Sequence, residues 1–409
     1  MNIKFPLAYC LFFCCFFLAK SQPNKFISTN GSKIIGTDGK EFLIRGTNLG
    51  NWLVPEGYMF KFKNATSPSL INQTFNELIG PEATKKFWND YLSNYITAGD
   101  IHYLKSLGMN SIRLPFHYKL FTDEYYMGGR GEARGFALLD RLIGWCRREG
   151  ILVILDMHCA PGGQTGDNID DSYGYPFLFD SPGSQELTIK IWRKIANHYK
   201  NEAAVLGYDL LNEPIAHYFD ASHFNPLLEP LYKRIVSAIR EVDRNHLVFL
   251  GGAQWDSNFK IFGQPFDKKT VYTFHKYWTE TTKEVIREYL DFRDQWKVPI
   301  YAGETGENDD EWILQFRTLL EANDIGWHFW PYKKMDDTRG IVTFDKPSSY
   351  SIIKSFADTS RISFEEIRRL RPKNSEQVKK VLDEFLMNCL FPNCKPNTSY
   401  IRALGLGAK

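Results

Sequence analysis

Short apolar runs rich in β-branched residues recur along the chain and predict strands. The runs are nearly continuous in apolar residues, instead of alternating apolar with polar. Such runs are typical of parallel strands that are covered on both faces of the sheet. We expect eight of these strands, at residues 42–46, 111–114, 151–157, 205–211, 247–250, 271–274, 298–302 and 326–329.

Longer segments between these runs carry apolar residues at helical spacing, as at residues 136–148, 187–198 and 228–242. We expect the residues around Pro226 and Pro230 to be a loop and a helix start, because proline disfavours helix interiors. Apolar positions across residues 378–386 predict another helix, which we expect to pack against the barrel and not to bind a partner.

The alternation of strands and helices predicts an α/β fold, a (β/α)8 TIM barrel. A bare barrel needs about 250 residues, so this chain of 409 residues must carry long βα loops. The surplus lies mainly between the first two strands and after the last, where we expect a C-terminal helical extension at about residues 359–409. No linker or repeat divides residues 22–409, which we expect to form a single domain.

Residues 1–21 resemble a secretory signal peptide. Lys4 supplies a positive start, residues 5–19 are apolar but too short for a comfortable membrane span, and small residues precede Gln22. We expect cleavage before Gln22 and a secreted, extracellular protein without a membrane span; a retained anchor is the competing interpretation. Four sequons that suit a glycoprotein follow, at Asn30, Asn64, Asn72 and Asn397.

Four cysteines remain beyond the predicted signal peptide. Cys389 and Cys394 are close in sequence and are expected to be able to form a small bridged loop in an oxidising compartment. Cys146 and Cys159 lie in separate predicted elements, and their pairing stays open.

The composition is that of an ordinary globular protein, with 43% hydrophobic and 24% charged residues. Lys and Arg number 50, against 48 Asp and Glu, and this balance argues against a nucleic-acid partner. Aromatic residues reach 15%, which is a rich supply of rings.

Polar and aromatic side chains gather where the predicted strands end. Active sites of (β/α)8 barrels lie at the C-terminal ends of the strands, so we expect one rim to carry the chemistry. In strand order these residues are Asn48, Asn51, Trp52 and Glu56; Arg113 and His117; Asp156 and His158; Asn212 and Glu213; Gln254, Trp255 and Asp256; His275, Tyr277 and Trp278; Glu304; and Trp330.

Two carboxylates stand out, Glu213 and Glu304, because each directly follows a buried strand. A charge there is costly unless it is paired or functional. Such a pair suits glycoside hydrolysis, in which one carboxylate stays ionised as nucleophile and the other is protonated as general acid. We expect Arg113 to hold Glu304 ionised, and His275 to tune the proton affinity of Glu213.

Leu211-Asn212-Glu213-Pro214 resembles the Asn-Glu-Pro signature of glycoside hydrolase family 5. The resemblance spans about residues 40–345 and implies that Glu213 is the acid/base, that Glu304 is the nucleophile and that Asn212 binds the sugar 2-hydroxyl. It also implies supporting or substrate-binding roles for Arg113, His158, His275, Tyr277 and Trp330.

Residues 45–56, Arg-Gly-Thr-Asn-Leu-Gly-Asn-Trp-Leu-Val-Pro-Glu, are similar to the N-terminal motif of the fungal exo-β-1,3-glucanase branch. In that branch the Glu contacts the non-reducing terminal sugar, which implies this role for Glu56. Asn51 stands where the branch usually has a second Gly.

The resemblance implies a retaining double displacement on an oligo- or polysaccharide, most naturally a β-glucan, without metal or organic cofactor. Retention requires the two carboxyls to lie about 5–5.5 Å apart. The alternatives are a non-catalytic carbohydrate-binding protein on the same fold, or a glycosidase of mannan or glycolipid. Endo or exo action depends on whether Glu56 and residues 51–110 block one end of the cleft.

Other chemistries are less well supported by the sequence. Asp156, His158 and His275 could ligate a metal, but no His-x-His pair ends the first strand. The loop at residues 162–166 is Gly-rich but lacks the Lys-Ser/Thr of a phosphate loop, and we expect a flexible loop at the rim of the sugar cleft. The Arg368-Arg369-Leu370-Arg371 cluster is interpreted as a solvated helix face.

Overall fold

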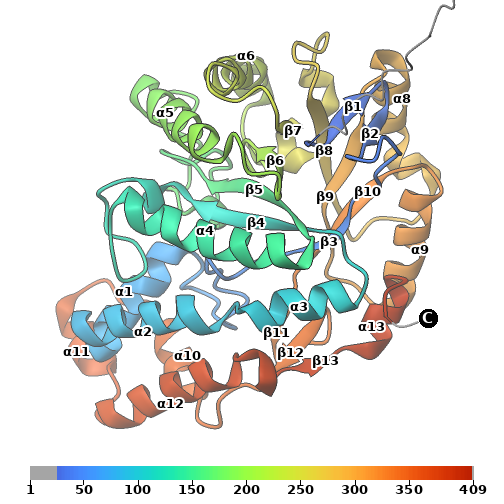
Figure 1. The fold of residues 1–409 in the computed structure, drawn as a ribbon. Coiled ribbons are helices and arrows are strands. Elements are labelled where there is room, and N and C mark those ends of the chain that lie inside the picture. Colours follow the sequence, from blue (N-terminus) through green and yellow to red (C-terminus); the bar gives the residue numbers. More distant parts are fainter. Residues whose placement is uncertain (1–24, 408–409) are drawn as a thin grey trace, which may run out of the picture.

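The computed structural model describes residues 25–407, and its centre is a closed barrel of eight parallel strands (Figure 1). The predicted signal peptide lies outside the described residues. All eight predicted strands are confirmed, although the first begins at Arg45 and not at residue 42. In barrel order they are β10 (Gly326–Trp330), β3 (Arg45–Asn48), β4 (Ser111–His117), β5 (Leu152–Cys159), β6 (Val205–Asp209), β7 (Leu247–Gly251), β8 (Thr270–Tyr277) and β9 (Ile300–Gly306).

Side chains fill the inside of the barrel, as in other (β/α)8 folds. Ile154, Leu206, Phe249 and Tyr301 belong to one buried apolar cluster within it. The outer layer consists of helices whose apolar faces pack on the strands. These helices are α3 (Ala98–Ser106), α4 (Glu132–Glu149), α5 (Pro182–Tyr199), α6 (Ala221–Arg240), α8 (Arg287–Trp296) and α9 (Asp310–Glu321). α7 (Ala253–Asp256) is a short turn that directly follows β7.

The expectation of a loop around Pro226 and Pro230 is wrong, because α6 runs through both prolines. Each proline removes one helical N–H donor. The helix persists because its apolar face is buried over several turns, from Phe224 to Ile239, and because Asp220 caps its first turn by accepting a hydrogen bond from the Ser222 N–H.

A second layer of helices covers the barrel on one side, at the lower left of Figure 1. It joins α1 (Pro68–Ile79) and α2 (Pro81–Asn94), which follow β3, to α10 (Ser351–Ala357), α11 (Phe364–Leu370) and α12 (Ser375–Asn388) near the C-terminus. The predicted C-terminal helix is therefore confirmed as α12, but its main contacts are with α1 and α2 and not with the barrel wall. Phe385 of α12 stacks on Phe60, with ring centroids 5.2 Å apart.

Short strands and one last helix complete the fold. β1 (Ser28–Asn30) pairs with β2 (Lys33–Ile35), and β12 (Val342–Phe344) lies between β11 (Lys333–Met335) and β13 (Lys395–Pro396). α13 (Thr398–Ala403) packs on α9. Among residues 25–407, no helix is both long and apolar enough to cross a bilayer.

The expected bridge between Cys389 and Cys394 does not form, since all four described cysteines are free thiols. Cys389 ends α12 and donates to the Leu386 carbonyl, 3.4 Å away. Cys394 follows a short turn and donates instead to the Leu390 carbonyl, also at 3.4 Å. Cys146 is buried on α4, and the Cys159 thiol donates to the Ile169 carbonyl at 3.3 Å.

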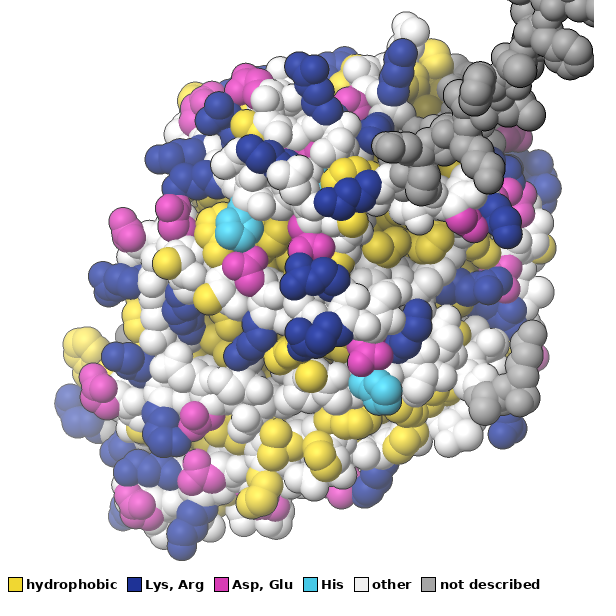
Figure 2. Space-filling view, in the orientation of Figure 1, with side chains coloured by type: hydrophobic (Ala, Val, Ile, Leu, Met, Phe, Trp, Pro, Cys, Tyr) yellow, Lys and Arg dark blue, Asp and Glu magenta, His cyan; other side chains and the backbone are white. Residues whose placement is uncertain are grey.

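The surface seen in Figure 2 carries both signs of charge. Lys and Arg side chains are interspersed with Asp and Glu over this face, and neither sign gathers into one continuous region. The view thus matches the balanced charge of the sequence.

Candidate active site

The C-terminal ends of the barrel strands surround a cleft of about 740 Å³. Seven of the nine predicted site residues line it: Glu56, His158, Glu213, His275, Tyr277, Glu304 and Trp330. The other two, Arg113 and Asn212, are completely buried and are not among the residues that line the cleft. The parallel register explains this convergence, because it sets Asn48 beside Arg113 and His275 beside Glu304 on neighbouring strands.

Arg113 is the buried cation beneath the cleft. Its Nε donates to Asp209 at 2.8 Å, and its Nη2 donates to Asn212 at 2.8 Å and lies 3.1 Å from Asp156. Its Nη1 donates to Glu304. Burial raises the pKa of Asp156 and of Asp209 to about 7, against the opposing effect of the Arg113 charge. The guanidinium thereby joins three carboxyls from different strands in one fixed arrangement.

Glu304 receives two hydrogen bonds from groups that favour its ionised form. Arg113 donates to one carboxylate oxygen, and the Tyr277 hydroxyl donates to the other at 2.9 Å. The side chain is 4% exposed and lies at the cleft. Donors on both oxygens fix the orientation of the carboxylate and stabilise its negative charge, as a nucleophile requires.

Glu213 lies in a different environment. Burial raises its pKa to about 7, and the nearest ring nitrogen, His275 Nδ1, lies 3.0 Å from its Oε1. Burial also lowers the pKa of His275 to about 3, so the imidazole is neutral near pH 7. Glu213 is thus poised to carry a proton at neutral pH, which is what a general acid needs.

The backbone at Glu213 has an uncommon conformation that a buried carboxyl holds in place. Glu213 has φ 45°, a left-handed conformation that is uncommon for residues other than glycine. Its N–H donates to Asp256 at 3.1 Å. Asp256 is completely buried, and its other neighbour is His275 Nε2, 3.3 Å away. Asp256 therefore contacts both the backbone of Glu213 and the imidazole beside the Glu213 carboxyl.

The two glutamates face each other across the cleft. One carboxyl oxygen of Glu213, one of Glu304 and a ring nitrogen of His275 all lie within 4.8 Å of one another. Inverting glycosidases separate their carboxyls by about 6.5–9.5 Å to admit a water, whereas about 5–5.5 Å is typical of a direct nucleophile. The close approach of one oxygen from each glutamate accords with the shorter of these two separations.

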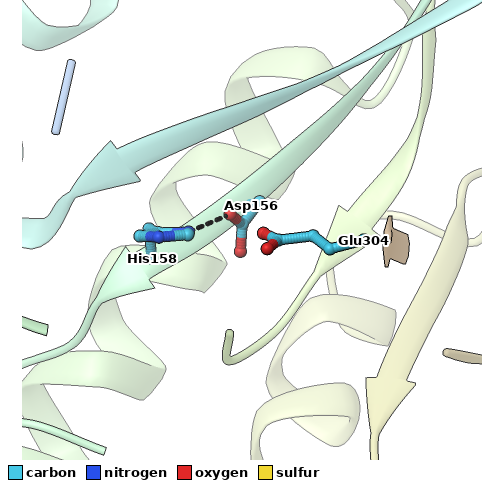
Figure 3. A group of neighbouring side chains, drawn as sticks. All are labelled: Asp156, His158 and Glu304. Atoms are coloured by element: carbon cyan, nitrogen blue, oxygen red, sulfur yellow. Dashed lines mark hydrogen bonds and ion pairs between the residues drawn. The ribbon is translucent and has the colours of Figure 1, made fainter. Parts of the chain in front are cut away.

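The same oxygen and nitrogen atoms could also be ligands of a metal ion. Glu304 belongs to two groups of potential ligands, one with Asp156 and His158 (Figure 3) and one with Glu213 and His275. In both groups, however, Glu304 already accepts hydrogen bonds from Arg113 and Tyr277. A cation bound there would lie against the Arg113 guanidinium, so the donor set suits an ion pair better than a metal.

Glu56 is a buried carboxyl among the residues that line the cleft. It is 4% exposed, and its Oε1 has no hydrogen-bond partner among the described residues. Burial, followed by the charges of Glu304 and Glu307, raises its pKa well above the usual value. Asn51 holds the Glu56 backbone by accepting its N–H at 2.9 Å. Asn51 has φ 63°, a conformation that glycine and asparagine tolerate best, which explains the residue found there.

Trp330 supplies a flat wall beside Glu56. Its ring stacks on His158 with centroids 5.7 Å apart and planes 7° apart, and its Nε1 donates to the Tyr58 hydroxyl at 2.7 Å. Burial lowers the pKa of His158 to about 4, so this stack is neutral. The flat ring, fixed at both ends, can lie against the apolar face of a sugar.

The sequence did not single out Gln164 as a site residue. This side chain is completely buried and donates to the carbonyls of His158 and Asn212, both at 2.8 Å. It also accepts the Ala160 N–H at 2.9 Å. The expectation of a flexible loop at residues 162–166 is wrong, because Gln164 fastens the loop to two strand ends and Asp170 accepts the N–H groups of Thr165 and Gly166. Its signal was a polar side chain set between glycines directly after a strand.

The barrel and its paired glutamates together define a barrel glycosidase. The family model described as cellulase, glycosyl hydrolase family 5, matches residues 71–336. The chain belongs to glycoside hydrolase family 5 and is a glycoside hydrolase.

Proteins similar to this chain have names that indicate several different activities. A beta-xylosidase of Phanerodontia chrysosporium is 34% identical over 80% of this chain and 74% of its own length. Endoglucanase C of Acetivibrio thermocellus is 28% identical over 61% of this chain and 88% of its own. The crystal structure of rutinosidase from Aspergillus niger shares the fold, with a TM-score of 0.58, 17% identity, and coverage of 78% of this chain and 98% of that one.

Proposed function

We propose that this chain is a secreted, retaining β-glycoside hydrolase that cleaves O-glycosidic bonds by double displacement, with a β-glucan as the favoured substrate class. The observation that carries the mechanism is the pair of glutamates, which have carboxyl oxygens within 4.8 Å of each other and lie in different environments. Glu304 has two hydrogen-bond donors, one of them cationic, whereas burial raises the pKa of Glu213 to about 7.

The environments assign the roles. Glu304 attacks the anomeric carbon while Glu213 protonates the departing oxygen, and a glycosyl-enzyme forms. Glu213, now ionised, then removes a proton from water as the water displaces Glu304. Arg113 and Tyr277 act as positioning residues for Glu304, and His275 positions Glu213. Asn212 is buried. It directly precedes Glu213 in the chain, and it accepts a hydrogen bond from Arg113, which also donates to Glu304.

The glycone, the sugar that Glu304 attacks, belongs at the end of the cleft with Glu56 and Trp330. Glu56 offers a carboxyl oxygen without a partner among residues 25–407, and Trp330 offers a ring face. This end supports contact with a terminal sugar and hence an exo-type action. The name of the endoglucanase relative and the likeness of residues 45–56 to exo-β-1,3-glucanases support a β-glucan.

Secretion is supported by the predicted signal peptide at residues 1–21 and by exposed sequons such as Asn30. Expression of the full chain in a eukaryotic host, followed by N-terminal sequencing of protein from the medium, tests this part. A mature protein that begins at Gln22 is expected, and retention of the whole chain in the membrane fraction would refute it.

One experiment tests both the activity and the stereochemistry. The purified enzyme is assayed on a panel of aryl β-glycosides and on laminarin, cellulose and mannan oligomers. NMR of the first-formed sugar from the best substrate then gives its anomeric configuration. We expect the β-anomer, while initial release of the α-anomer would refute the retaining mechanism. Trapping with a 2-fluoro glycoside should label Glu304, located by peptide mass spectrometry.

A further inference from the structure

We infer that Asp256 is a positioning residue for the general acid and acts on it through His275. The Asp256 carboxyl keeps a proton, donates it in a hydrogen bond to His275 Nε2, and so leaves the proton of the ring on Nδ1, beside Glu213. The inference rests on the proposed function, because it explains how the proton of Glu213 stays available for the leaving group. Asp256 itself is not among the residues that line the cleft.

Asp256, His275 and Glu213 are connected by short polar contacts. Asp256 Oδ2 lies 3.3 Å from His275 Nε2, and His275 Nδ1 lies 3.0 Å from Glu213 Oε1. The same Oδ2 atom accepts the Glu213 N–H at 3.1 Å. Asp256 and His275 are both buried. Asp256 therefore reaches the acid by two routes, one through the backbone of Glu213 and one through the imidazole.

The surroundings of Asp256 favour its neutral form. Its Oδ1 has no hydrogen-bond partner among residues 25–407, and no Lys or Arg in this part of the chain forms an ion pair with it. A buried oxygen without a donor costs more free energy in a carboxylate than in a neutral acid. Burial, followed by the charges of Asp209 and Glu213, raises the pKa of Asp256 well above its usual value. The proton lies on Oδ2, because this is the oxygen that faces an acceptor, His275 Nε2.

A second buried Asp–His pair, outside the cleft, shows the contrast. Asp243 Oδ2 accepts the Tyr208 hydroxyl at 2.7 Å and lies 2.6 Å from His246 Nδ1, and its Oδ1 accepts the Asn245 N–H at 2.7 Å. Against the effect of burial, the hydrogen bond from His246 lowers the pKa of Asp243. Asp243 has donors on both oxygens and is an ionised acceptor, whereas Asp256 lacks these donors and suits a donating role.

The turn after β7 is shaped to hold the Asp256 carboxyl in this place. A Cβ atom on Gly251, the last residue of β7, would lie 1.7 Å from Asp256 Oδ1, so only glycine leaves room for the carboxyl. Gln254, Trp255 and Asp256 have φ of 50°, 62° and 56°, which residues other than glycine rarely adopt. Such conformations persist where the surrounding structure fixes them, and they cluster at functional sites.

The position of the ring proton decides where the proton of Glu213 lies. Burial lowers the pKa of His275 to about 3, so near pH 7 the ring is neutral and carries one proton. With this proton on Nδ1, the ring donates to Glu213 Oε1, and the carboxyl proton stays on Oε2 for the leaving oxygen. With the ring proton on Nε2, Nδ1 would accept the carboxyl proton instead and hold it away from the substrate.

The neighbouring charges favour a proton on Nδ1. This nitrogen also lies 3.7 Å from Glu304 Oε2, so a proton there is close to two carboxyls. Nε2 has no hydrogen-bond partner in the described part of the chain that would compete with the Asp256 hydroxyl. The other titratable groups that act on Asp256 or His275, or that feel their charge, are Asp209, Arg113, His158 and Tyr232.

Nitrogen NMR measures the position of the ring proton directly. Protein labelled with 15N-histidine shows which nitrogen of each neutral ring is protonated, and His275→Gln identifies the signals of this residue. We expect Nδ1 to be protonated in the wild type and Nε2 in Asp256→Asn. The amide of that variant keeps its oxygen toward the Glu213 N–H and can only accept from Nε2. A ring proton on Nε2 in the wild type overturns the inference, whether or not the protein is active.

The pH profile tests the effect on the acid. In Asp256→Asn, Nδ1 accepts the Glu213 proton and favours the protonated carboxyl. The basic limb of kcat/KM should therefore move up by about one pH unit, and kcat/KM on a methyl glycoside should fall about tenfold, which corresponds to one hydrogen bond. A 2,4-dinitrophenyl glycoside needs no acid in its first step, and its kcat/KM should not change.

The outcomes separate this role from a structural one. Asp243→Asn, which alters the other buried Asp–His pair, is the matched control and should keep the basic limb in place. A limb that stays in place in Asp256→Asn indicates a structural role, and a limb that moves down indicates that Asp256 is ionised in the wild type; either result overturns the inference. If no glycoside is hydrolysed, the proposed function fails, while NMR still decides where the ring proton of His275 lies.

Discussion

Replacement of Glu213 by Gln separates the acid role from every other contribution of this residue. The amide has nearly the same shape as a protonated carboxyl, but it cannot release a proton. Glu213 stands 3.0 Å from His275 Nδ1, and the amide of the Glu213→Gln variant would keep a polar contact there. The glycone contacts proposed for Glu56 and Trp330 are untouched. The variant therefore tests proton transfer rather than substrate binding.

The structure sets the size and the pH dependence of the effect. Burial raises the pKa of Glu213 from 4.5 to about 7, which corresponds to about 3 kcal/mol of preference for the protonated form. The acid is present below pH 7 and is lost as the pH rises through about 7, so kcat/KM of the wild type should fall on that side. Glu213→Gln should lose this basic limb and about 10²–10⁴ of kcat/KM on alkyl glycosides.

The assay uses leaving groups that do or do not need a proton. A 2,4-dinitrophenyl glycoside leaves without protonation, so its first step should change little in Glu213→Gln, and added azide should restore turnover by replacing water. Glu280→Gln, an exposed carboxylate close to the cleft in sequence, is the control and should behave as wild type. Equal losses on dinitrophenyl and alkyl glycosides, or a basic limb that survives in Glu213→Gln, would refute the assignment of Glu213 as acid.

Three other changes have defined outcomes. Arg113→Met leaves buried carboxyls without their cation and should lower the free energy of unfolding by about 3–5 kcal/mol, measured by urea titration; an unchanged midpoint would contradict this. Gln164→Glu keeps the acceptor for the Ala160 N–H but loses two donated bonds, and should cost about 1–3 kcal/mol for each carbonyl left unpaired, with a matching fall in Tm. In secreted protein, glycopeptide mass spectrometry should find a glycan on exposed Asn30 and none on Asn397, whose amide is 8% exposed and donates to the Gly340 carbonyl at 2.8 Å; a glycan on Asn397 would show that this contact is absent.

The strands could be predicted from sequence because burial on both faces leaves a plain apolar run. Ile154 and Leu155 in β5, for example, are both completely buried although they point to opposite faces. The predicted bounds of β3 were the least precise. Arg45–Asn48 has no apolar run, and it is a strand because it pairs with β4 and β10. The prolines of α6 misled the prediction because tertiary burial outweighs the local cost of a missing donor.

The site residues at strand ends could be predicted, because in this fold chain order fixes the rim on which they meet. Gln164 and the contacts of Asp256 could not. Their roles depend on which carbonyl, N–H or imidazole lies within hydrogen-bond reach, and this distance is set by loops whose conformation has no periodicity in the sequence. The contacts of α12 with α1 and α2 were missed for a similar reason, because an apolar helix face shows that the helix packs but not which element it packs against.

The contact of Phe385 with Phe60 joins a late segment of the chain to an early one that precedes most of the barrel. Phe60 follows the turn from Asn51 to Glu56, and Tyr91, also in ring contact with Phe385, donates its hydroxyl to the Asn51 carbonyl. That turn emerges early from the ribosome, yet its aromatic support arrives more than three hundred residues later. A chain cut short before α12 would keep both glutamates and all eight barrel strands. We expect such a chain to bind the terminal sugar more weakly while it retains the two glutamates that carry out the proposed reaction.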